Sequence, residues 1–120
     1  MRFSPSLLLV LVTVFFTGCG DPTPLYQSND PEIARRNDAG VMLMGRYDYD
    51  GAFEAFATLL EDHPGLLDVR TNLAIAQLNR QRDGDEAAAI AVFRSVLADD
   101  PTHQHARYGL GLLLVRAGEE

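Results

Sequence analysis

One amphipathic helical pattern occurs twice in this chain, and the duplication constrains the fold more than any other feature. Residues 50–64 (DGAFEAFATLLEDHP) and residues 87–101 (AAAIAVFRSVLADDP) align without gaps at a separation of 37 residues. The aligned pairs of identical residues are Ala52/Ala89, Phe56/Phe93, Leu60/Leu97, Asp62/Asp99 and Pro64/Pro101. A small helix pair cannot bury its own apolar face, so a duplicated pair predicts a stack of similar units that share one core.

Turn signals divide residues 31–118 into five predicted helices. The first begins with Asp30 as a cap and Pro31 at the first helical position, and the last begins after Thr102, the expected N-cap, and ends near Gly118. No segment alternates polar and apolar residues with the period of two that marks a half-buried strand. The sequence therefore predicts an all-α fold of antiparallel helix hairpins, two full repeats plus a terminal helix. The predicted helices span roughly residues 31–46, 50–62, 66–80, 85–99 and 103–117.

The spacing of small and aromatic residues resembles the tetratricopeptide repeat (TPR). In that family the second helix of each repeat carries Ala, an aromatic residue four positions later and Pro eight positions after that. The first helix carries a small residue, often after Leu. The matching residues are Ala52, Phe56 and Pro64; Ala89, Phe93 and Pro101; and Gly40, Ala74 and the pair Leu110-Gly111. The resemblance implies an α-solenoid over residues 31–118, with both phenylalanines buried between helix pairs.

The chain also departs from the family pattern. Arg36, Arg70 and Arg107 stand where the family usually has a large aromatic residue. The family period of 34 residues becomes 37 in the second repeat, and the sequence places the extra residues around Gln81 to Asp83.

The resemblance further implies a binding surface on the concave face, which the first helix of each repeat lines. Two interpretations of this face remain open: a binding site for a protein or peptide, or core covered by the tether, by another helix or by a second copy. The family's Lys and Asn clamp for a peptide carboxylate is absent, because the chain has no Lys. The residues at concave positions are Asn37, Val41, Met44, Thr71, Ile75, Leu78, Tyr108, Leu112 and Val115.

The N-terminal residues predict export. Arg2 precedes an apolar run at residues 7–16 that is too short to span a bilayer, so residues 1–18 fit a signal peptide. Cys19 is the only cysteine, and the segment from Phe16 to Cys19 resembles a bacterial lipobox. The resemblance implies lipid attachment at Cys19, a flexible tether over residues 19–30 and a location in the bacterial cell envelope. Gly20, rather than Asp, follows the cysteine, and by resemblance to enteric lipoprotein sorting this implies the outer membrane rather than the inner one.

Nothing in the sequence assembles a catalytic or metal site. His103 and His105 are two positions apart, so they point to different sides of a helix, and the expectation for both is solvated residues at a helix start. Neither Ser28 nor Ser95 lies in a nucleophile motif. The chain has 17 acidic residues against 10 arginines, which disfavours nucleic-acid binding. The sequence thus predicts no enzyme, no cofactor and no nucleic-acid partner.

Two functions remain from this reasoning. The first is an exported, lipid-anchored scaffold that binds another protein or peptide. The alternative is an assembly module with no separate ligand, either a homodimer or the N-terminal repeat segment of a larger secreted protein. Residues 103–117 bear on both, because apolar residues surround most of this helix. Leu113, or its neighbours on the uncovered face, is therefore predicted to pack against something outside the stack.

Overall fold

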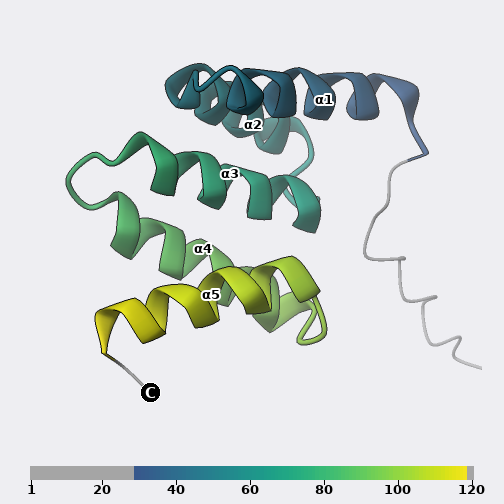
Figure 1. Cartoon of the computed structure of the whole chain (residues 1–120). Helices are drawn as coiled ribbons and strands as arrows, with labels where there is room; N and C mark the ends of the chain where they lie inside the picture. The colour runs from purple at the N-terminus through teal and green to yellow at the C-terminus, as the bar shows by residue number, and fades with distance from the viewer. Residues whose placement is uncertain (1–28, 119–120) are drawn as a thin grey trace, which may run out of the picture.

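The computed structural model describes residues 29–118, and these form five α-helices without a strand. The helices are α1 (Pro31–Gly45), α2 (Tyr49–Asp62), α3 (Leu67–Arg80), α4 (Asp85–Asp99) and α5 (Gln104–Ala117). Each helix packs against the next in antiparallel fashion, and α3 also contacts α1 and α5 (Figure 1). The predicted all-α helical-repeat fold is confirmed, with helix bounds within about one residue of those expected. Residues 1–18, Cys19 and most of the tether lie outside the described residues.

Side-chain caps mark the starts of α1, α2 and α5, whereas α3 and α4 begin without a side-chain cap. The carboxylate of Asp30 accepts a hydrogen bond from the amide of Glu32 at 2.9 Å, as predicted for the start of α1. The predicted cap of α5 is wrong: His103, and not Thr102, accepts from the amide of Ala106 through its Nδ1 atom at 3.2 Å. Thr102 is held in the preceding turn, because both its amide and its hydroxyl donate to the carboxylate of Asp100.

Two apolar clusters form the core, one around each copy of the duplicated segment, and α3 contributes to both. Phe56 and Phe93 have no exposed surface and lie at the centres of the two clusters, as predicted. Burying an aromatic side chain of this size contributes a few kcal/mol. The duplicated segment thus repeats because each copy supplies one buried anchor to a continuous stack.

The three extra residues of the second repeat are spread over three places rather than inserted in one turn. Helix α3 continues for one residue more after Ala74 than α1 does after Gly40. The connection from α3 to α4 is one residue longer than that from α1 to α2. Helix α4 begins one residue further before Ala89 than α2 begins before Ala52. Gln81 and Gly84, at the two ends of this connection, have φ angles of 56° and 83°. The left-handed backbone at Gly84 suits a residue without a Cβ atom.

The terminal helix α5 sits in a different register from the one expected for Leu113. This side chain is only 4% exposed and belongs to the second core cluster, so its predicted contact outside the stack is wrong. Gly109 faces the ring of Phe93, where a Cβ atom would lie 2.7 Å from the nearest ring carbon. The side of α5 that carries Ala106, Gly109 and Leu113 therefore packs on the stack. The neighbours of Leu113 that remain uncovered are Leu112 and Val115.

Candidate protein-binding surface

Exposed apolar side chains gather on one side of α5. Tyr108, Leu112 and Val115 are 75%, 59% and 72% exposed. Residues four and seven positions apart lie on the same face of a helix, so the three side chains form one patch. We call it the α5 patch. Single exposed apolar residues are ordinary on a protein surface, but contiguous apolar patches mark sites of interaction.

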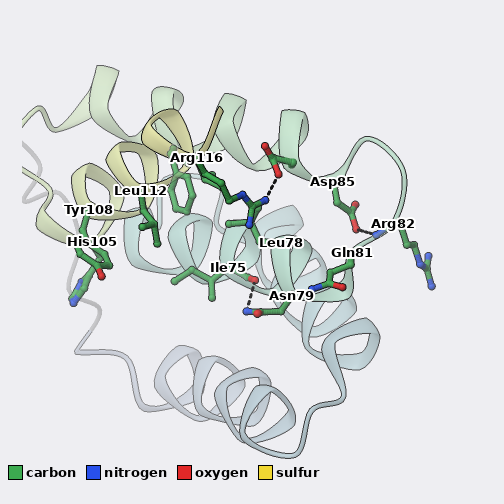
Figure 2. Close-up of a pocket in the computed structure, with 14 residues that line it drawn as sticks. Ile75, Leu78, Asn79, Gln81, Arg82, Asp85, His105, Tyr108, Leu112 and Arg116 are labelled. Atoms are coloured by element: carbon green, nitrogen blue, oxygen red, sulfur yellow. Dashed lines mark hydrogen bonds and ion pairs between the residues drawn. The ribbon is translucent and has the colours of Figure 1, made fainter. Parts of the chain in front are cut away.

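An open groove of about 600 Å³ lies beside this patch, between α3, α5 and the start of α4. Its lining includes apolar side chains from α3 and α5, each the first helix of its repeat unit. They are Ile75 and Leu78 from α3, and Leu112 and Leu113 from α5. Figure 2 shows the labelled side chains of the two helices around the groove. The second hairpin and the terminal helix therefore build one shared concavity, and part of its lining is apolar.

Charged residues surround the groove at the α4 end. The guanidinium of Arg116 on α5 forms an ion pair with Glu86 on α4, which connects the terminal helix to the second hairpin (Figure 2). Asp85, also in the groove lining, accepts two hydrogen bonds from Arg80, at 2.8 and 3.0 Å, and one from the amide of Arg82 at 2.8 Å. The Arg80 guanidinium holds the pKa of the Asp85 carboxyl well below its ordinary value, although burial opposes this effect.

Arg80 also connects this end of the groove to the first hairpin. Its guanidinium carbon lies 4.0 Å from the ring centroid of Phe53 on α2, a cation–π arrangement. The cation is thus held between an aromatic ring and a carboxylate. This arrangement connects the end of α3 to α2 and to the start of α4.

The nine residues predicted to line the concave face do not all lie together in the structure. Ile75, Leu78, Tyr108 and Leu112 come together in the groove, and Val115 extends the exposed face beside it. The other four residues lie elsewhere: Asn37, Val41, Met44 and Thr71.

These four have separate roles or none. Thr71 is 2% exposed and donates its hydroxyl to the carbonyl of Leu67, so it belongs to the core and is not available to a partner. Asn37 accepts a hydrogen bond from Asn72 at 3.1 Å, which joins α1 to α3, and Met44 packs on the first cluster. Val41 is 43% exposed and lies outside the groove lining. In the N-terminal part of the face, Thr71 and Met44 therefore belong to the helix packing while Val41 is exposed, and the predicted residues that come together lie in the C-terminal part.

Sequence reasoning missed the polar residues of the groove. Arg82, Glu86, His105 and Arg116 all line it, but single charged residues in turns and at helix ends carry no pattern that distinguishes them from ordinary solvated charge. His103 was expected to be solvated, yet its side chain is only 10% exposed and its Nε2 atom lies 2.9 Å from the carboxylate of Asp68 on α3. This contact fixes α5 against α3.

The described residues contain no cluster of three or more potential metal ligands, and no helix among them is long and apolar enough to cross a membrane. No protein-family model matches the sequence, and no curated protein matches it significantly. The helix order and packing define the class: an all-α helical-repeat protein with an apolar groove and patch at its C-terminal end.

Proposed function

We propose that this chain is a TPR scaffold that binds another protein through the groove and the α5 patch. The observation that carries the proposal is the exposure of Tyr108, Leu112 and Val115 on one face of α5. Protein interfaces commonly pair an apolar centre with a polar rim, and Tyr is enriched among the residues that dominate binding. The groove has both parts, with Arg82 and Glu86 at its edge.

The mechanism is recognition on a largely preformed surface, without any bond made or broken. The largely buried Arg80–Asp85 pair connects the end of α3 to the start of α4 before a partner arrives. A rigid surface loses little conformational entropy on binding, which favours affinity.

The scaffold would act in the bacterial cell envelope. Lipid at Cys19 would anchor it, and residues 19–30 would give the helical domain reach from the membrane. The Gly that follows Cys19 supports the outer membrane as the location.

The second candidate is an assembly module in which another copy covers the α5 patch. The same exposed apolar residues favour it, but charge opposes the simplest symmetric version. Helix α5 carries Arg107 and Arg116 and no acidic residue, so two α5 helices face to face would bring like charges together. We therefore rank recognition of a different protein first.

Site-specific photocrosslinking in living cells of the native host tests the proposed function. A photoreactive amino acid at Leu112 should give a discrete adduct with a second polypeptide, whereas the same group at Ala91, exposed on α4, should not. An adduct of twice the mass of the chain would support the assembly module instead. Identical labelling from both positions, or none from Leu112, would reject recognition through this surface.

A further inference from the structure

An arginine recurs at the same place in the first helix of each unit. The guanidinium of Arg36 on α1 donates to the carboxylate of Asp62 at 2.8 Å, and that of Arg70 on α3 donates to Asp99 at 2.5 Å. Asp62 is the last residue of α2, and Asp99 is the last residue of α4. In both hairpins, therefore, the end of the second helix is paired with the start of the first.

Arg107 is the third member of this series, because it follows Arg70 by the same 37 residues that separate Asp62 from Asp99. Its side chain is exposed, and the guanidinium forms no hydrogen bond or ion pair with any residue from 29 to 118. Its acidic partner would have to come from a helix that packs on α5 as α2 packs on α1.

The space for such a helix is open next to Arg107. Four residues after each arginine stands a small residue: Gly40 in α1, Ala74 in α3 and Gly111 in α5. The ring of Phe56 fills the space in front of Gly40, and Ala74 is completely buried. A Cβ atom built on Gly111 would meet nothing within 4 Å. The place that an aromatic ring fills against α1 is therefore empty against α5.

Charge indicates what kind of helix fits this space. The helix α2, which covers α1, contains four acidic residues and no basic one. The helix α5 contains two arginines and no acid, so it complements an acidic helix and opposes a second α5.

We propose that the face of α5 formed by Arg107, Gly111 and Val115 binds an amphipathic acidic α-helix of the partner protein. The partner helix runs antiparallel to α5, places an aromatic residue opposite Gly111 and pairs an acidic residue at its C-terminal end with Arg107. In both α2 and α4 the acid follows the aromatic residue by six positions, which is the spacing expected in the partner. The inference rests on the proposed function, since it names the kind of partner that the scaffold recognises.

The test uses a fluorescent peptide with the sequence of residues 49–64 and the full chain purified in detergent. Anisotropy should show saturable binding of this peptide, and a peptide with the change Asp62→Arg should bind about tenfold more weakly. The chain variant Arg107→Asp should prefer the altered peptide, and this exchange of preference identifies Arg107 as the contact. Gly111→Leu should abolish binding by filling the space for the ring.

A second measurement is needed because the isolated peptide can be too weakly helical to bind. The same sequence is attached behind Glu120 through a short flexible linker, and the urea midpoint of unfolding is measured for this fusion. The midpoint should rise, and Gly111→Leu should remove the rise. The proposal is wrong if the Arg107 and Gly111 substitutions change neither peptide binding nor the urea midpoint of the fusion. It is also wrong if the chain alone forms a dimer that Gly111→Leu dissociates. If these tests fail but the photoreactive group at Leu112 still gives an adduct, the scaffold recognises a partner of another kind. Failure of the acidic-helix proposal is therefore distinguishable from failure of the proposed function.

Discussion

Gly40 and Phe56 fit together only because residue 40 has no side chain: a Cβ atom there would lie 2.5 Å from the Cε1 atom of the ring. Gly109 and Phe93 repeat this relationship between α5 and α4, with a closest approach of 2.7 Å. Gly111, two positions further along α5, has open space instead. Gly40, Gly109 and Gly111 thus show which helix faces are covered and which are not.

Alanine substitutions at these glycines should have opposite effects. Gly40→Ala should lower the free energy of unfolding by about 1–3 kcal/mol, because the ring is fully buried and cannot give way without strain. Gly111→Ala should raise it by about 0.5–1 kcal/mol, because alanine favours a helix more than glycine does. Urea denaturation of the two variants checks the pair. A shift in the same direction for both would show that α5 is not open at Gly111.

Two adjacent leucines of α5 should differ sharply. Leu113→Gln buries a polar amide in the second core and should cost about 2–4 kcal/mol, whereas Leu112→Gln changes an exposed position and should cost less than about 0.5 kcal/mol. Chemical denaturation of the purified chain measures both. Equal losses would mean that the register of α5 is different from the one described.

Protonation of Asp85 should destabilise the fold in acid. Because its folded-state pKa is depressed below the ordinary 3.8, its contribution to stability is complete above that value and is lost as the pH falls below it. The loss of stability between about pH 4 and pH 2 should be smaller in Asp85→Asn than in the wild type. Asp83→Asn removes an exposed carboxylate that accepts no hydrogen bond from the described residues, so it serves as the control. Equal acid dependence in wild type and Asp85→Asn would contradict the role of the Arg80–Asp85 pair.

Lipid attachment predicts a specific response to removal of the thiol. Cys19→Ser should block acylation and release the chain from the membrane fraction, because stable anchoring needs the acyl chains, at about 0.8 kcal/mol per buried methylene. Fractionation and electrophoretic mobility measure this outcome. A variant that sediments and migrates like the wild type would exclude the anchor.

The fold was predictable from sequence because helix periods, caps and prolines are local signals, and the duplicated segment located Phe56 and Phe93 directly. The groove was less predictable. Its apolar lining came from helix-face positions, but whether Thr71 or Tyr108 is exposed depends on which other helix covers it, and that is a tertiary property. The prediction that Leu113 lies on the uncovered side of α5 was wrong for the same reason. Gly109 and Gly111 are equally small, and only packing on Phe93 distinguishes them.

Hydrogen exchange of α5 tests the central claim, that a second polypeptide covers this helix in the cell envelope. Amide exchange is measured by mass spectrometry for the full chain in native membranes and for the chain purified in detergent. The account predicts that α5 amides exchange about tenfold or more slowly in the membranes, while amides of α2, which does not line the groove, exchange at similar rates in both samples. Equal exchange of α5 in the two samples would contradict the claim, because a covering partner must protect the helix it covers.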